Sequence, residues 1–205
     1  MKRINEIFYS LQGEGMNTGR AAVFVRFSGC NLRCPFCDTQ HQQGQSYEDD
    51  SIVQEALGLV RGITAEKHLA IFTGGEPSLQ LDSELVEKFH AAGFKVAVET
   101  NGTRPLPNNV DFVTISPKDD FLPEQERKPL EGLINRIPSE LKVVYNGKNN
   151  IKNWERFPAL AYYLQPCDTG DAEKNAEIIR KSIEFIKANP KWRLSLQTQK
   201  ILDIR

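Results

Sequence analysis

The chain of 205 residues has little of what marks several common protein classes. Its four cysteines are too few for a small scaffold held together by disulfide bonds. Lys and Arg number 26 and Asp and Glu 27, so no charge excess favours a nucleic-acid partner or a disordered acidic tail. The longest apolar run, residues 159–164, is far too short to cross a bilayer. No apolar segment follows Lys2 and Arg3, so we expect no signal peptide, no membrane contact and a cytoplasmic protein.

What the sequence does contain is an alternation of short apolar strands and amphipathic helices, which indicates an α/β fold. Strands are expected at residues 21–27, 69–72, 95–99, 112–115, 141–145, 162–165 and 193–197. Helices are expected at residues 50–61, 82–92 and 171–188, the last with Ala176, Ile179, Ile183 and Ile186 on one apolar stripe. Such βα units form parallel sheets.

The length limits which parallel architecture is possible. A complete eightfold (β/α) barrel typically needs about 250 residues. We therefore expect a single domain over residues 1–205 with a compact or incomplete parallel (β/α) barrel. Residues 118–138, which are charged and contain three prolines, are expected to form an irregular surface excursion of that domain.

Three of the four cysteines, Cys30, Cys34 and Cys37, form a C-x3-C-x2-C pattern directly after the first expected strand. Three thiolates on one short loop suit a 4Fe-4S cluster in which one iron keeps an open position. A structural zinc site usually pairs two C-x2-C units or adds two histidines. Cys167 and His41 lack such spacing, so zinc and inert buried thiols stay as the less favoured alternatives.

This pattern, with Phe36 before the last cysteine, resembles the signature of the radical S-adenosylmethionine superfamily. A second motif, Thr-Gly-Gly-Glu-Pro at residues 73–77, follows the strand expected at 69–72 and resembles the superfamily's GGE motif. On its own that motif would be merely a turn. The order of the two motifs implies a cluster whose open iron binds S-adenosylmethionine, which is cleaved to methionine and a 5′-deoxyadenosyl radical.

A more specific resemblance covers nearly the whole chain. Residues 10–15, 37–39, 99–102, 116–118, 165–166 and 192–198 are similar to the 7-carboxy-7-deazaguanine synthase family of the queuosine pathway. That family contracts 6-carboxy-5,6,7,8-tetrahydropterin to 7-carboxy-7-deazaguanine with loss of ammonia, using the cluster, S-adenosylmethionine and Mg²⁺. The resemblance implies a carbon–nitrogen lyase with a shortened barrel of the radical S-adenosylmethionine type. It also implies a homodimer and a reductant such as flavodoxin or ferredoxin.

The resemblance assigns roles position by position. The cluster ligands would be Cys30, Cys34 and Cys37. S-adenosylmethionine would contact Phe36, Cys37, Asp38, Gly75, Ser116, Pro117, Lys118, Gln165, Pro166, Cys167 and Asp168. The pterin would contact Leu11, Gln12, Gly13, Glu14, Arg26 and Thr73, with Arg26 pairing with its carboxylate. Thr39 would bind Mg²⁺, with substrate oxygens and water completing the octahedron. The candidates for a catalytic role are Glu14, Glu99 and Gln199.

Plainer interpretations stay open for several of these residues. Arg26 could pair with a structural acid, Thr39 could be a turn hydroxyl, and Glu14 could be a solvated loop charge. Family members usually have histidine where Gln199 stands, and glutamine does not titrate, so its role is open. The alternative functions are an activase of a glycyl-radical enzyme and a zinc-binding interaction module. The small-molecule pocket implied by residues 11–15 and Thr39 favours the lyase.

Overall fold

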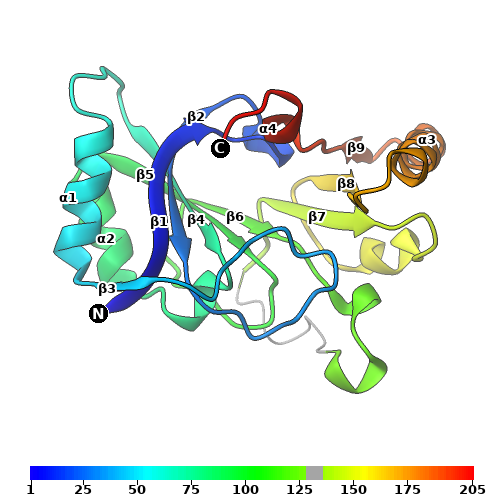
Figure 1. The fold of residues 1–205 in the computed structure, drawn as a ribbon, viewed down its shortest axis with the longest axis horizontal. Coiled ribbons are helices and arrows are strands. Elements are labelled where there is room, and N and C mark those ends of the chain that lie inside the picture. The colour runs from blue at the N-terminus through cyan, green and yellow to red at the C-terminus, as the bar shows by residue number, and fades with distance from the viewer. Residues whose placement is uncertain (128–135) are drawn as a thin grey trace.

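One curled sheet organises the described residues, 1–127 and 136–205, of the computed structural model (Figure 1). Its strands are β1 (Lys2–Leu11), β2 (Ala21–Phe27), β3 (Gln45–Tyr47), β4 (His68–Gly74), β5 (Phe94–Thr100), β6 (Phe112–Ile115), β7 (Glu140–Tyr145), β8 (Tyr162–Pro166) and β9 (Trp192–Leu194). They lie in the order β3-β1-β2-β4-β5-β6-β7-β8-β9. Strands β2 and β4 to β9 run parallel, whereas β1 pairs antiparallel with β2 and β3.

The sheet is an open barrel, because β3 and β9 end it at separate edges within the described part of the chain. This confirms the incomplete parallel barrel predicted from the sequence. The α-helices are α1 (Asp49–Leu59), α2 (Ser83–Ala91), α3 (Ala172–Ala188) and α4 (Thr198–Ile201). The 3₁₀ helices are η1 (Gly15–Asn17), η2 (Pro77–Leu79), η3 (Asp119–Phe121), η4 (Glu124–Glu126) and η5 (Ile151–Arg156). Of the described helices, none is long and apolar enough to cross a membrane.

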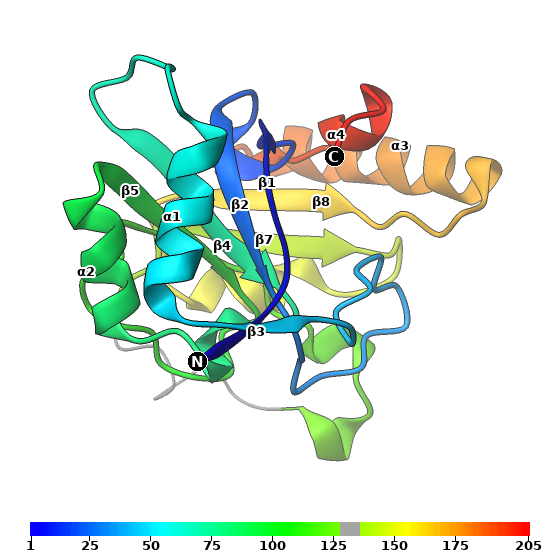
Figure 2. The ribbon, with the colours of Figure 1, turned by 60° about the vertical axis from the view of Figure 1, so that its left-hand side comes forward.

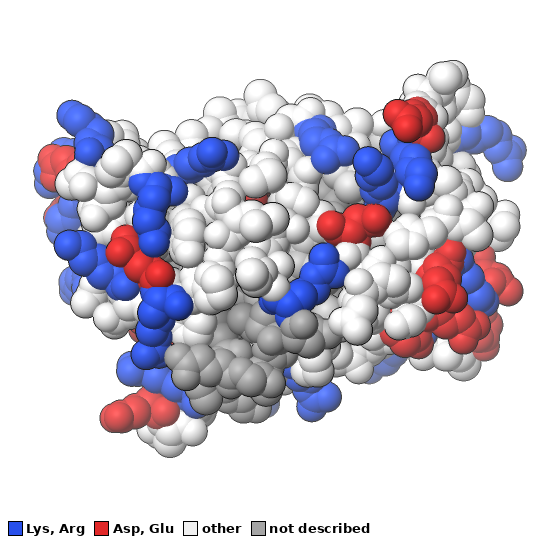
Figure 3. Space-filling view, turned by 180° about the vertical axis from the view of Figure 1, so that it is seen from behind, with Lys and Arg blue, Asp and Glu red and all other residues white. Residues whose placement is uncertain are grey.

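The helices cover the outside of the curled sheet at its two ends. Figures 1 and 2 show α1 and α2 beside β1 and β5, and α3 beside β8 and β9. Between them and the strands lies the main core, in which Phe72 and Phe89 meet edge to face with ring centroids 4.9 Å apart. Basic and acidic side chains both occur on the face in Figure 3, in several places directly beside one another.

The sequence analysis missed several elements and misjudged one. Strand β1 was not predicted, because a register shift between Ile4 and Glu6 breaks its alternation of apolar and polar residues. The short β3 and α4 were also missed, and the strand expected at 193–197 ends at Leu194. Part of the excursion expected at 118–138 forms η3 and η4, and its residues 128–135 lie outside the described residues.

The stripe expected from the sequence of α3 is not the one that the sheet buries. Ile179 and Ile183 are 37% and 43% exposed, whereas Ile178 and Ser182 are buried. Both sets have helical spacing, so the pattern alone could not separate them. Packing against β8 and β9 selects the stripe that contains Ile178.

Candidate active site

The carboxyl ends of the parallel strands open into one cavity of about 1090 Å³. In Figure 2 the arrowheads of β7 and β8 point toward the side where the loop between β2 and β3 lies. The predicted site residues come together here: the cavity is lined by Leu11, Gln12, Gly13, Glu14, Arg26, Cys30, Cys34, Phe36, Cys37, Asp38, Thr39, Thr73, Gly75, Glu99, Ser116, Lys118, Gln165, Pro166, Cys167, Asp168 and Gln199. Pro117 is the one predicted site residue that does not line it. Their individual roles stay predictions.

The loop that carries the three cysteines is anchored to neighbouring strand ends. Nδ2 of Asn101, directly after β5, donates to Oδ1 of Asn31 at 3.0 Å. All three cysteines are free thiols, and Cys30 and Cys34 are half-buried. Burial raises the pKa of both of these thiols, so they are protonated at neutral pH until a metal displaces the proton.

The arrangement of these thiols bears on which metal group would fit them. Within residues 1–127 and 136–205, no three His, Cys, Asp or Glu side chains converge closely enough to hold one metal ion. A single zinc would need such convergence. A 4Fe-4S cluster places its thiolates on different irons, so thiols spaced along a loop at the mouth of a large cavity suit it.

The Gly-Gly-Glu-Pro turn after β4 brings its backbone close to the cysteine loop. A Cβ on Gly75 would lie 1.8 Å from the carbonyl oxygen of Gly29, so only glycine fits there. The next residue, Glu76, is 1% exposed and accepts hydrogen bonds from Thr100 Oγ1 at 2.6 Å and the Asn101 amide at 2.7 Å. Glu76 therefore ties β4 to β5 and fixes the turn on which Gly75 faces the cavity.

A buried lysine on β7, Lys142, joins two carboxylates inside the cavity. Its Nζ pairs with Glu14 Oε2 and lies 3.4 Å from Glu99 Oε1, and its side chain is only 6% exposed. Glu99 Oε2 also accepts from Thr73 Oγ1 at 2.9 Å, and its Oε1 accepts from Gln12 Nε2 at 3.2 Å. The sequence analysis missed Lys142, although a lysine within an apolar strand is itself a signal of a buried partner.

The C-terminal segment completes the surroundings of Glu14. Oε1 of Glu14 accepts hydrogen bonds from Gln197 Nε2 at 3.0 Å and from Gln199 Nε2 at 3.3 Å. Burial alone would raise the pKa of Glu14, but the ammonium of Lys142 outweighs burial and holds this pKa well below its usual value. Oε1 of Gln199 is buried without a hydrogen-bond partner among the described residues.

A second lysine of the cavity, the partly buried Lys118, lies near the cysteine loop. Its Nζ donates to Ser116 Oγ at 2.5 Å and lies 5.8 Å from the centre of the Phe36 ring. Burial lowers the pKa of Lys118, and the charge of Lys142 lowers it further. A partly buried ammonium that donates to a neutral hydroxyl is well suited to an anionic group of a ligand.

Arg26 has a protein partner in this structure. Its Nε pairs with Glu6 Oε1 at 2.8 Å, and its Nη1 donates to Thr39 Oγ1 at 3.3 Å. Arg205 reaches the other oxygen of Glu6 at 2.5 Å, and both guanidinium groups lie over the ring of Phe8. Arg26 thus forms the ion pair with a protein acid that the plainer interpretation predicted. This ion pair also orients Arg26 beside Thr39.

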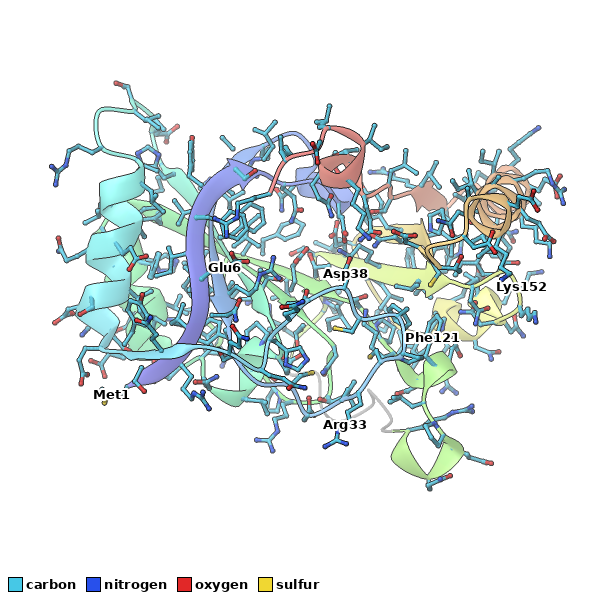
Figure 4. The ribbon with its side chains drawn as sticks, in the orientation of Figure 1. Met1, Glu6, Arg33, Asp38, Phe121 and Lys152 are labelled. Atoms are coloured by element: carbon cyan, nitrogen blue, oxygen red, sulfur yellow. The ribbon has the colours of Figure 1, made fainter. Side chains whose placement is uncertain are left out.

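The helix α4 brings a third lysine to the cysteine loop. Lys200 Nζ lies 3.1 Å from Asp38 Oδ2 and 2.9 Å from Asp168 Oδ2. Figure 4 shows Asp38 on the part of the loop nearest to α4, whereas Arg33 lies on its outer side. Cys167, which precedes Asp168, is buried as a free thiol.

Comparisons with known proteins agree with this arrangement. Residues 24–119 match the model of the radical SAM superfamily. The chain is 47% identical over 205 residues to a 7-carboxy-7-deazaguanine synthase of Bacteroides thetaiotaomicron, covering 100% of both chains. It is 38% identical to the synthase of Burkholderia multivorans, covering 98% of each. The crystal structure of QueE from Escherichia coli is similar with a TM-score of 0.66 and 28% identity, covering 96% of this chain and 93% of that one.

Proposed function

From the premise that the chain belongs to the 7-carboxy-7-deazaguanine synthase family, we propose how its cavity performs the family's reaction. The protein is a radical S-adenosylmethionine lyase of queuosine biosynthesis. It contracts the ring of 6-carboxy-5,6,7,8-tetrahydropterin to give 7-carboxy-7-deazaguanine and ammonia. The observation that carries the proposal is that three free thiols, the buried ammonium of Lys142 and its two partly buried carboxylate partners all line one cavity of about 1090 Å³. That volume is sufficient for more than one small ligand.

The cluster and S-adenosylmethionine belong at the cysteine-loop end of this cavity. When bound, they supply the radical that removes a hydrogen atom from C6 of the pterin. We assign Cys30, Cys34 and Cys37 as the cluster ligands. The S-adenosylmethionine contacts are assigned to the residues named above for that role, with the Lys118 ammonium placed for its carboxylate.

The pterin belongs at the other end of the cavity, where its ring would lie against residues 11–13 and Thr73. Glu14 and Glu99 would accept hydrogen bonds from its ring N–H groups. Gln199, whose Oε1 lacks a partner in the described structure, would accept a further hydrogen bond from the pterin. A histidine nitrogen at this place could accept that hydrogen bond in only one of its two tautomers. Arg26 would hold the substrate carboxylate, and its ion pair with Glu6 orients it for that contact.

The magnesium assignment rests on Thr39. Its hydroxyl oxygen lines the cavity next to Arg26, so a carboxylate held by Arg26 would lie close to it. A single neutral oxygen binds Mg²⁺ weakly, so the ion would depend on oxygens of the substrate and water. We further propose a cytoplasmic homodimer reduced by flavodoxin or ferredoxin, on the basis of the family resemblance.

The experiment that tests this function is anaerobic turnover. Reconstituted protein is incubated with 6-carboxy-5,6,7,8-tetrahydropterin, S-adenosylmethionine, Mg²⁺ and dithionite, and the product is identified by mass spectrometry. We expect about four irons per chain and formation of 7-carboxy-7-deazaguanine. C34A should lose iron and activity, while the matched control C167A keeps its iron. A protein with full iron content and no deazaguanine product would overturn the function, and a colourless protein with one zinc would favour the zinc module.

Substitution T39A tests the metal assignment separately. Removal of the hydroxyl should raise the Mg²⁺ concentration needed for half-maximal activity about tenfold or more and leave the iron content unchanged. Serine at this position keeps the oxygen and serves as the control. If T39A responds to Mg²⁺ as the wild type does, Thr39 is a turn hydroxyl and not a ligand.

A further inference from the structure

Lys142 contacts only one of the two oxygens of each carboxylate with which it forms an ion pair. Lys142 Nζ pairs with Oε2 of Glu14 and Oε1 of Glu99. The remaining oxygen of each carboxylate accepts from neutral side chains: Glu99 Oε2 from Thr73, and Glu14 Oε1 from Gln197 and Gln199. A ligand can replace such donors, whereas the lysine is held at 6% exposure on β7.

The lysine lies on a strand inside the sheet, whereas the two carboxylates come from two other segments of the chain. Lys142 lies in the middle of β7, between parallel neighbours β6 and β8. Glu99 lies at the end of β5, and Glu14 lies in the connection between β1 and β2, just before η1. The ammonium is therefore a fixed point that sets the distance between two carboxylates from separate parts of the chain.

We propose that Lys142 is a positioning residue that holds the carboxylates of Glu14 and Glu99 in place, so that the remaining oxygen of each is aimed at the ring N–H groups of the bound pterin. This inference rests on the proposed function, because it takes the pterin as the ligand at this end of the cavity. Without the ammonium between them the two carboxylates would repel each other. The cation also lowers the pKa of Glu14, and a carboxylate is a stronger acceptor than a protonated carboxyl.

Other charged side chains on the neighbouring elements face Lys142 and its two carboxylate partners. Lys118 follows β6, and Glu140 lies two residues before Lys142 on β7. The acidic groups around the ammonium are Glu14, Glu99 and Glu140, so Lys142 is the cation that balances them most directly. Glu140 is occupied elsewhere, because it accepts from the Met16 amide at 2.7 Å and from Thr114 Oγ1 at 2.9 Å.

The test compares K142M with K142R and the wild type. Apparent kcat and KM for 6-carboxy-5,6,7,8-tetrahydropterin are measured from about pH 5.5 to pH 9, and pterin affinity is measured in parallel by anaerobic equilibrium dialysis. K142M should raise KM and the dissociation constant about 10- to 100-fold. It should also introduce an acid limb in kcat/KM that the wild type lacks over this pH range, because Glu14 loses the cation that lowers its pKa. K142R should keep the wild-type profile, and KM for S-adenosylmethionine and the iron content should not change.

The outcomes separate this inference from the function on which it rests. If K142M folds with full iron content and keeps the wild-type pH profile and pterin affinity, Lys142 does not position the carboxylates. If K142M does not fold, K142M/E99Q removes one carboxylate together with the cation and is compared with E99Q; equal pterin affinities at every pH would overturn the inference. A wild type that binds pterin without forming product would contradict the proposed function, while the binding data would still decide the role of Lys142.

Discussion

Two lysines of this protein each bind two carboxylates, yet the two clusters lie in different surroundings. Lys2, at the start of β1, lies 3.1 Å from Asp49 and 2.7 Å from Asp82. Lys142, in the middle of β7, pairs with Glu14 and Glu99. Both lysines are nearly inaccessible, with side chains 9% and 6% exposed. In Figure 1 the first cluster belongs to the N-terminal end beside α1 and α2, far from β7.

The difference lies in what else the carboxylates bind. Asp82 caps α2 by accepting from the Leu85 amide at 3.0 Å, and Asp49 lies in the first turn of α1. Helix starts leave amides without partners, so Asp82 satisfies one of them, and the negative charge of Asp49 is favourable at the start of α1. In the Lys142 cluster the additional donors are side chains that line the cavity. The first cluster therefore stabilises the fold, and the second is available to a ligand.

The largest effect is expected when the second cluster loses a carboxylate. E99Q removes the charge but keeps the shape, so the ligand loses a charge-assisted hydrogen bond. We expect kcat/KM for the pterin to fall about 10- to 100-fold, corresponding to about 1.5–3 kcal/mol, with a melting temperature close to that of the wild type. Steady-state kinetics and calorimetry measure both. The matched change D82N should show the reverse pattern, and a similar loss of activity in D82N would contradict the comparison.

An intermediate effect, on stability alone, is expected when the first cluster loses its lysine. K2M leaves two carboxylates without their cation at two helix starts and should lower the free energy of unfolding by about 1–3 kcal/mol. Denaturant titration measures this loss, and kcat/KM of the folded enzyme should not change. If K2M lowered kcat/KM as E99Q does, the division between a structural and a ligand-binding cluster would be wrong.

The same variant has a predicted pH dependence. Burial alone would raise the pKa of Asp82, but the hydrogen bonds from Lys2 and from the Leu85 amide, together with the charge of Lys2, outweigh burial and lower this pKa below its usual value of 3.8. A carboxylate with a lowered pKa in the folded state stabilises fully above its unfolded value, and this stabilisation is lost as the pH falls through the folded value. The stability of the wild type should therefore decline below about pH 4 more steeply than that of K2M. Parallel slopes would contradict the role of Lys2.

These clusters also show where prediction from the sequence ends. The parallel strands are local patterns of apolar residues, and the cysteine loop is a local pattern of spacing. Residues 21–37, for example, were sufficient to predict both β2 and the cysteine loop that follows it. Glu14 and Lys142 are 128 positions apart in the chain, and no local pattern pairs them. The bulge near Glu6 hid β1, so the partner of Arg26 was also hidden. Local chemistry was thus predictable, whereas contacts that depend on strand order were not.

A more exposed lysine between two carboxylates, Lys88, gives the smallest expected effect and tests whether burial decides the outcome. Lys88 lies 2.7 Å from Asp50 and 3.4 Å from Glu84, but its side chain is 32% exposed and theirs are 82% and 73% exposed. Water solvates such charges well without the ion pair, so K88M should have the melting temperature and the kcat/KM of the wild type within error. A small shift at low salt should disappear at high salt, because salt screens exposed charges. If K88M destabilised the protein as much as K2M does, the number of ion pairs and not their burial would determine stability.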